Sequence, residues 1–168
     1  MKSSVDEIRQ RFDADVERFS NLQTGQSATV DAPLAMALVA QAAAATMPHV
    51  RHVLDVGCGA GNYTLKLLEH LPNLDVTLID LSQSMLERAT QRIKQATTGR
   101  IKTIQGDLRE VELSEGAFDI VRAATVLHTC GPTRSGRMSS HLSTGRYGPV
   151  VPFGSTIWSR VPCLRSKN

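Results

Sequence analysis

The 168 residues suffice for one domain with a hydrophobic core, and 41% hydrophobic with 21% charged side chains is typical of a globular protein. The three cysteines, Cys58, Cys130 and Cys163, are odd in number and widely spaced, so we expect neither a disulfide framework nor a zinc site. The amino terminus lacks the apolar segment of a signal peptide, and no stretch offers the roughly 18 apolar residues of a membrane span. These features predict a cytoplasmic protein without a membrane partner.

The net charge of +3 is unevenly distributed along the chain. None of the 16 acidic residues lies beyond Asp119, whereas six of the 19 basic residues follow Cys130. Residues 1–130 therefore carry a net charge of −3, and residues 131–168 carry +6. The last segment is also rich in glycine, proline and serine and shows no helical or strand period, which predicts an irregular basic tail over residues 129–168.

Two helices are predicted before residue 48. Apolar side chains stand at helical spacing between charged ones near the amino terminus: Val5, Ile8, Phe12 and Val16. This spacing predicts an amphipathic helix over residues 4–18. A run rich in alanine, leucine and methionine predicts a second helix over residues 31–45, with Asp31 as its N-cap and Pro33 in its first turn.

From Arg51 onward, short apolar runs alternate with helical segments. The apolar runs predict strands at residues 52–56, 75–80, 101–105 and 118–124. The segments after the first two strands predict helices that end near His70 and Gln95. Alternation of this kind favours a parallel sheet with right-handed crossovers, so the predicted fold class is α/β, a doubly wound sheet of β-α-β-α repeats.

The segment from Val53 to Tyr63 reads VLDVGCGAGNY and joins the first predicted strand to the following helix. Its glycines at positions 57, 59 and 61 allow a sharp turn and a close approach of the backbone to a ligand. The helix that follows presents unpaired N–H groups at its start. A loop of this kind is also compatible with NAD, so the ligand has to be inferred from the neighbouring carboxylates.

Three carboxylates lie at or just after the ends of successive predicted strands. Asp55 lies two residues before the first glycine, where a carboxylate favours a bound cation and repels a pyrophosphate. Asp80 ends the second strand, 19 residues after Gly61, a position from which a carboxylate accepts ribose hydroxyls. Asp107 follows the third strand and is suited to accept a hydrogen bond from an adenine amino group, with the Leu108 N–H available to a ring nitrogen.

With these motifs, residues 50–128 resemble the class I S-adenosylmethionine-dependent methyltransferases, which have a Rossmann-like fold. The resemblance implies a cofactor-binding core over residues 49–128 and N-terminal helices over residues 1–48 that cap the site. It also implies that Asp55 and the glycines line the methionine moiety and that Asp80 holds the ribose. The residues expected to bind the cofactor are Asp55, Gly57, Cys58, Gly59, Gly61, Asn62, Asp80, Leu81, Met85, Asp107, Leu108 and Ala123.

The segment from Phe118 to His128 resembles the fourth motif of this family, which borders the reacting methyl group. Arg122 departs from the apolar residue usual there, and it could be a substrate ligand or a strand-end side chain that reaches solvent. The resemblance implies methyl transfer from S-adenosylmethionine by in-line displacement, leaving S-adenosylhomocysteine, a reaction that depends on orientation more than on acid–base catalysis. We therefore assign no catalytic residue and note only that His128 and Tyr63 are near the predicted site. We expect a small-molecule acceptor ahead of nucleic acid, and no metal.

In the family the fourth motif continues into another helix and further strands, which the sequence after Leu127 does not show. With one base added after the His128 codon, a back-translation with suitable third codon bases is compatible with the family-like segments His-His-Leu-Arg and Leu-Arg-Pro-Gly-Gly. We therefore predict that residues 129–168 are an out-of-frame translation, that strand 118–124 lacks its outer neighbours, and that turnover is impaired. Two alternatives stay open, a non-catalytic S-adenosylmethionine-binding module and a nucleic-acid-binding protein that uses the basic tail.

Overall fold

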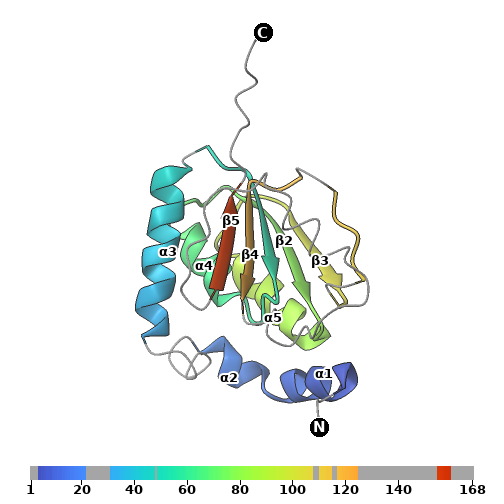
Figure 1. Ribbon diagram of the computed structural model, residues 1–168. Helices are drawn as coiled ribbons and strands as arrows, with labels where there is room; N and C mark the ends of the chain where they lie inside the picture. The colour runs from blue at the N-terminus through green and yellow to red at the C-terminus, as the bar shows by residue number, and fades with distance from the viewer. Residues whose placement is uncertain are drawn as a thin grey trace.

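The computed structural model describes residues 4–21, 31–47, 49–107, 110–114, 117–124 and 155–159. They contain a five-stranded sheet with the order β3-β2-β1-β4-β5 (Figure 1). The strands are β1 (His52–Val56), β2 (Asp75–Asp80), β3 (Ile101–Gln105), β4 (Ile120–Ala124) and β5 (Ser155–Ser159). β1 to β4 run parallel, which confirms the predicted α/β sheet, and β5 pairs antiparallel with β4.

The end of the sheet at β4 differs from the prediction in two ways. β4 begins at Ile120 rather than at Phe118, because Asp119 turns toward the start of β1. There its Oδ2 accepts the N–H groups of Arg51 and His52, each at 3.0 Å. The expectation that β4 lacks an outer neighbour is wrong, since β5 pairs along all of β4 although it lies within the predicted irregular tail.

Helices α3 (Ala32–Thr46), α4 (Asn62–Leu68) and α5 (Gln83–Ile93) accompany the sheet. The side chains that form the larger core cluster include Ala40, Ala43, Val53, Leu67, Leu78, Leu86, Ala89, Ile93 and Ile120. A second cluster on the other face of the sheet contains Leu54, Val56, Ile79, Val121 and Ala123. Because side chains alternate between faces along a strand, burial of both faces explains the nearly continuous apolar runs in the sequence.

The helix boundaries depart slightly from the predicted ones. α4 and α5 each end two residues before the predicted His70 and Gln95. Asp31 stands at the N-cap position of α3, but its backbone is left-handed (φ 53°) and its side chain makes no capping hydrogen bond. Its predicted position as N-cap is therefore confirmed, but its side chain does not cap the helix, and Pro33 lies in the first turn as expected.

The helix predicted over residues 4–18 is two helices, α1 (Val5–Ala14) and α2 (Val16–Ser20). They are separated at Asp15, whose φ of −116° and ψ of 20° are not helical. The bend brings the ring centroids of Phe12 and Phe19 to 5.2 Å, whereas a straight helix would separate residues seven apart by about 10 Å along its axis. α1 and α2 lie beyond the end of the sheet at which the parallel strands finish (Figure 1).

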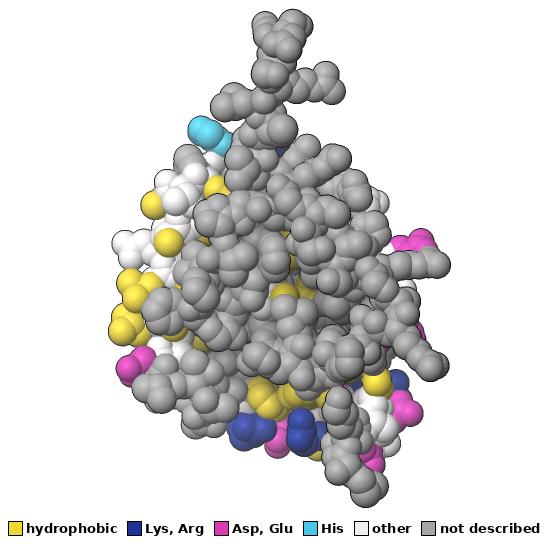
Figure 2. Space-filling model, viewed as in Figure 1, with side chains coloured by type: hydrophobic (Ala, Val, Ile, Leu, Met, Phe, Trp, Pro, Cys, Tyr) yellow, Lys and Arg dark blue, Asp and Glu magenta, His cyan; other side chains and the backbone are white. Residues whose placement is uncertain are grey.

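Apolar and charged side chains gather on different parts of the surface. Figure 2 shows hydrophobic side chains at the edge formed by α3, where Leu34 and Leu38 are exposed one turn apart. Lysine or arginine side chains lie next to acidic ones near the N-terminal helices in the same view. Within the described residues, no helix combines the length and the apolar character needed to cross a membrane.

Candidate functional site

The glycine loop joins β1 to α4 at the carboxyl end of the sheet. Gly57, Gly59 and Gly61 have φ values of 65°, 51° and 79°, which side-chain-bearing residues rarely adopt. The N–H groups of Gly57 and Cys58 donate to the Ile79 carbonyl at 2.8 and 3.1 Å, which fastens the loop to β2. Burial raises the pKa of the Cys58 thiol, so this side chain fills the loop and is not an activated nucleophile.

Asp80 ends β2 and holds the glycine loop from the other side. Its Oδ2 accepts the Gly59 N–H at 2.8 Å, and its Oδ1 accepts the Ser82 N–H at 3.0 Å. Burial raises the pKa of the Asp80 carboxyl above its ordinary value, although these N–H groups oppose the shift. A carboxylate offers about four lone-pair positions, so Asp80 keeps capacity for the hydroxyl groups of a ligand.

Two glycines of the loop have different surroundings. A Cβ at Gly59 would meet no atom within 4 Å, so the loop is open on that side. A Cβ at Gly61 would lie 3.0 Å from Ile93 Cδ1 and 3.2 Å from Ala89 Cβ, so this glycine allows the loop to pack closely on α5. Open space at Gly59, next to the Asp80 carboxylate, provides both the room and the polar group that a nucleoside needs.

The predicted adenine contacts lie at the ends of β2 and β3. Asp107 is half-buried just after β3, and Leu108 lies outside the described residues. Leu81 is half-buried, and its carbonyl accepts a hydrogen bond from Gln105 Nε2 at 3.1 Å. The Met85 side chain is 1% exposed, so it packs inside the fold rather than at an open surface.

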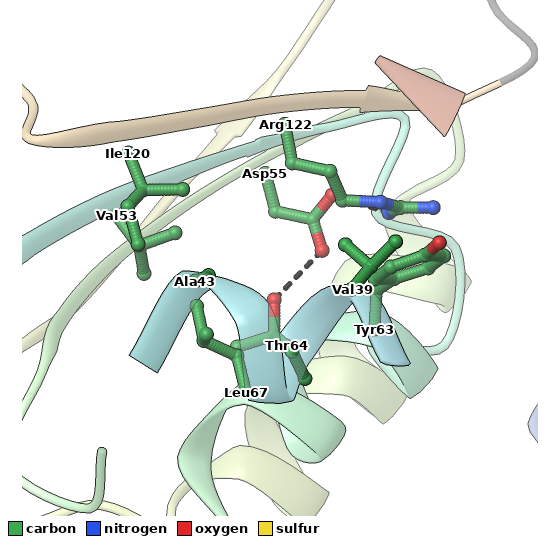
Figure 3. Close-up of a pocket in the computed structure, with 10 residues that line it drawn as sticks. Val39, Ala43, Val53, Asp55, Tyr63, Thr64, Leu67, Ile120 and Arg122 are labelled. Carbon is green, nitrogen blue, oxygen red and sulfur yellow. Dashed lines mark hydrogen bonds and ion pairs between the residues drawn. The ribbon is translucent and has the colours of Figure 1, made fainter. Parts of the chain in front are cut away.

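Asp55 and Arg122 form a buried ion pair (Figure 3). They are register partners in β1 and β4, so their side chains project side by side from one face of the sheet. Arg122 Nη1 lies 2.6 Å from Asp55 Oδ1, and Thr64 Oγ1 donates to Asp55 Oδ2 at 2.7 Å. Asp55 is 0% exposed and Arg122 is 6% exposed. Asp55 therefore already faces one cation, that of Arg122, and the interpretation of Arg122 as a side chain that reaches solvent is wrong.

Tyr63 and a small cavity complete this part of the site. Arg122 Cζ lies 3.8 Å from the centroid of the Tyr63 ring, a cation–π contact. A cavity of about 20 Å³ adjoins the pair and is walled by Asp55, Tyr63, Thr64, Arg122 and apolar residues, a volume that holds about one water molecule. Ala123 is buried in the cluster on the other face of the sheet, and His128 lies outside the described residues.

Asn62 links the glycine loop to the N-terminal helices. Its Nδ2 donates to the Phe19 carbonyl at 2.9 Å, and its Oδ1 accepts Arg92 Nη1 at 2.8 Å. The same Arg92 nitrogen donates to the Ala60 carbonyl at 2.6 Å, and burial lowers the pKa of the Arg92 guanidinium. Sequence reasoning identified Asn62 but missed Arg92, because a charged residue on an amphipathic helix gives no signal of a contact made 32 residues away.

A second set of contacts fastens the N-terminal helices beside Asp80. Ser82 Oγ donates to an Asp13 carboxylate oxygen. Arg88 pairs with Glu17 and donates from Nε to Ser20 Oγ at 3.1 Å. Together with Asn62, these contacts hold α1 and α2 against the elements that begin at the glycine loop and at Asp80.

In sequence, a methyltransferase domain family matches residues 53–144. A malonyl-[acyl-carrier protein] O-methyltransferase of Legionella pneumophila is 36% identical over 78 residues, which cover 46% of this chain and 27% of that protein. The chloroplastic 2-methyl-6-phytyl-1,4-hydroquinone methyltransferase 1 of rice, Oryza sativa, is 36% identical over 113 residues, covering 66% and 33%. The chain therefore spans about a quarter to a third of the length of these relatives.

Among solved structures, the fold is similar to that of the N-methyltransferase NodS from Bradyrhizobium japonicum in complex with S-adenosylhomocysteine. The TM-score is 0.54 at 24% identity, covering 71% of this chain and 59% of that one. Phosphoethanolamine N-methyltransferase 1 of Haemonchus contortus gives a TM-score of 0.51 at 20% identity, covering 77% and 28%. These similarities confirm the expected Rossmann-like fold.

Proposed function

The chain belongs to the methyltransferase domain family, and we propose from this that it transfers a methyl group from S-adenosylmethionine to an acceptor, leaving S-adenosylhomocysteine. The observation that carries the proposal is the contact between the glycine loop and Asp80. Asp80 Oδ2 accepts the Gly59 N–H at 2.8 Å, while Gly59 keeps open space beside its Cα. A carboxylate next to a backbone that a ligand can approach closely supports ribose binding there.

In this proposal the nucleoside half of the cofactor lies over β2 and β3. Asp80 accepts the ribose hydroxyls, Asp107 and Leu108 bind the adenine, and Leu81 supplies apolar contact. The methionine half lies over the loop that follows β1. Its proposed contacts are Asp55, Gly57, Cys58, Gly59, Gly61, Asn62 and Ala123.

The chemistry asks the chain for orientation and exclusion of water. The bound cofactor supplies a methyl group already activated on a sulfonium. The chain then has to align the acceptor with that methyl and keep water away. The position of α1 and α2 at the end of the sheet, with the Ser82–Asp13 and Arg88–Glu17 contacts, supports their role as the cap (Figure 1). We assign no catalytic base.

We propose a small-molecule acceptor ahead of a nucleic acid. The two relatives are named as methyltransferases of malonyl-[acyl-carrier protein] and of 2-methyl-6-phytyl-1,4-hydroquinone. The net charge of −3 over residues 1–130 gives this part of the chain no excess of positive charge for nucleic acid. The cytoplasmic location remains a prediction.

We also propose that residues 129–168 are an out-of-frame translation. Two features support this proposal. Residues 129–168 contain no acidic residue, and the back-translation with one added base is compatible with a Leu-Arg-Pro-Gly-Gly segment. The family match extends to residue 144, beyond residue 128, after which the reading frame is proposed to change. The nucleotide sequence of the gene is therefore the test of this proposal. A longer open frame after one added base would support the proposal, and a closed frame would refute it and make salt-dependent RNA binding by the tail the next measurement.

The cofactor proposal is tested by titration calorimetry of the full chain with S-adenosylhomocysteine and, separately, with NADH. We expect binding of the first and none of the second. Asp80→Asn should weaken binding of S-adenosylhomocysteine roughly tenfold to a hundredfold, because hydrogen bonds from the ribose to a charged acceptor are lost. The matched control is Asp75→Asn at the other end of β2, which should bind like the wild type.

The outcomes separate the proposed activity from its alternatives. No binding of S-adenosylhomocysteine by the wild type would refute the cofactor assignment. Equal weakening by Asp80→Asn and Asp75→Asn would refute the role of Asp80. Methyl transfer is then measured with labelled S-adenosylmethionine and a panel of small acceptors, and binding without transfer after restoration of the reading frame would point to a non-catalytic module.

A further inference from the structure

The ion pair between Arg122 and Asp55 leaves the guanidinium Nε without a partner among the described residues. Nη1 makes the 2.6 Å contact with Asp55. Nε is buried and has no hydrogen-bond partner in the part of the chain that the structure describes. Nε shares its edge with Nη2, and these two nitrogens form the planar fork that binds a carboxylate through two parallel bonds.

The pair also lies where a ligand is expected to cross the sheet. In the order β3-β2-β1-β4, the chain reverses its direction of winding between β1 and β4, and ligands of doubly wound sheets bind outside the strand ends at this point. Arg122 and Asp55 are register partners across it. Figure 3 shows the guanidinium extending past Asp55 and over Tyr63, toward the end at which β4 finishes.

The position of the nucleoside determines which end of the cofactor reaches the pair. The next step rests on the proposed function. If Asp80 at the end of β2 holds the ribose, the amino-acid end of the cofactor extends from β2 toward β1 and β4. That end is a zwitterion with one ammonium and one carboxylate group. Asp55 and Arg122 offer the complementary charges side by side, 2.6 Å apart.

We propose that Arg122 binds the α-carboxylate of the cofactor through Nε and Nη2 while its Nη1 stays paired with Asp55. The pair then acts as one dipolar receptor for the amino-acid end. Asp55 has about four lone-pair positions, of which Arg122 and Thr64 use two, so it can also accept the α-ammonium. Arg122 thus becomes a binding residue that selects for the amino-acid part of the cofactor.

The small cavity indicates how the group has to enter. Its volume of about 20 Å³ holds about one water molecule, which is less than an amino-acid group needs. Binding therefore requires the Arg122 side chain to shift while the two charges stay in contact. The cation–π contact with Tyr63 at 3.8 Å and the ion pair with Asp55 are the two contacts that hold the guanidinium in its present position.

The test compares two ligands that differ only in the amino-acid end, S-adenosylhomocysteine and 5′-methylthioadenosine. Arg122→Lys keeps a positive charge beside Asp55 but loses the planar fork. We expect this variant to bind S-adenosylhomocysteine roughly tenfold to a hundredfold more weakly than the wild type. It should bind 5′-methylthioadenosine with unchanged affinity, and calorimetry measures both without any need for turnover.

A second variant guards against loss of folding. Asp55→Asn combined with Arg122→Met removes both charges, and replacing both members of a buried pair is often tolerated. We expect it to retain 5′-methylthioadenosine binding and to lose the preference for S-adenosylhomocysteine. Equal losses for both ligands, or no loss for either, would overturn the role of Arg122 while leaving the cofactor assignment intact. A wild type that binds neither ligand would refute the cofactor assignment itself.

Discussion

The two ends of the sheet use charged residues in opposite ways, and β2 shows this within one strand. At its carboxyl end, Asp80 is largely buried, and burial raises the pKa of its carboxyl. At its amino end, the Asp75 carboxyl accepts the backbone N–H and the side chain of Arg100, and these bonds lower its pKa. The same residue type is therefore desolvated at one end and stabilised as an anion at the other.

The amino end contains exposed pairs that join neighbouring strands. The His52 ring lies 3.4 Å from Asp75 and 3.7 Å from Asp119, and Arg100 lies 2.8 Å from Asp75. The carboxyl end instead contains the fully buried contact of Asp55 with its arginine. Exposed pairs contribute little to stability, whereas a buried charge is costly without its partner. The paired charges at the carboxyl end are therefore interdependent, whereas those at the amino end can be changed one at a time at little cost.

The largest effect expected from this comparison concerns the two arginines. Arg122→Met leaves Asp55 buried without its cation and should lower the free energy of unfolding by about 3–5 kcal/mol. Arg100→Met breaks an exposed, solvent-screened pair and should lower it far less. Urea denaturation of both variants measures the difference. Similar losses in the two variants would contradict the contrast between the ends of the sheet.

A smaller effect is expected within the glycine loop. Gly61→Ala combines left-handed backbone strain with a Cβ 3.0 Å from Ile93 and should cost about 3 kcal/mol. Gly59→Ala meets no atom within 4 Å and should cost only about 1 kcal/mol, from backbone strain. Its methyl group nevertheless enters the open space proposed for the cofactor. We expect Gly59→Ala to be more stable than Gly61→Ala in urea denaturation. It should nevertheless bind S-adenosylhomocysteine more weakly than the wild type. Undiminished binding would show that the ligand does not occupy the space beside Gly59.

The smallest effect expected is the pH dependence of stability at the two ends of β2. The pKa of Asp75 is lowered by folding, so its stabilising contribution is present above its ordinary pKa and is lost as the pH falls through the folded value. The pKa of Asp80 is raised, so acidification through the range above its ordinary pKa favours the folded state. As the pH falls, the wild type should lose its stability advantage over Asp75→Asn. The stability of the wild type relative to Asp80→Asn should instead rise. Urea midpoints at several pH values measure both, and the same sign for the two variants would contradict the assignment.

Local patterns were sufficient where a segment is buried or turned by its own residues. The strands at residues 52–56, 75–80 and 101–105 have the predicted bounds. For the strand at residues 52–56 the reason is burial of both faces, which requires apolar side chains nearly throughout. The glycine loop was equally readable, since Gly57, Gly59 and Gly61 all adopt positive φ values. The position of Asp80 at the end of the next strand was also predicted, but its hydrogen bond with Gly59 was not.

Contacts between segments distant in sequence could not be predicted in this way. Asp119 shortens β4 because it accepts N–H groups 67 and 68 residues away. The break at Asp15 allows Phe12 to meet Phe19, and both helices then depend on partners in α5. Neither feature produces a periodic pattern in the sequence, since each depends on a surface that exists only after the sheet has formed.

By itself, the sequence determined the α/β class, the glycine loop and the acids at the ends of the strands, because each follows from the period or conformation of a few neighbouring residues. The tertiary structure alone decided that Arg122 faces Asp55, 67 residues away. That partnership depends on the register of β1 against β4, which aligns one residue of each strand on the same face. Register is a property of paired strands, so the pairing of these two charges could be seen only in the folded chain.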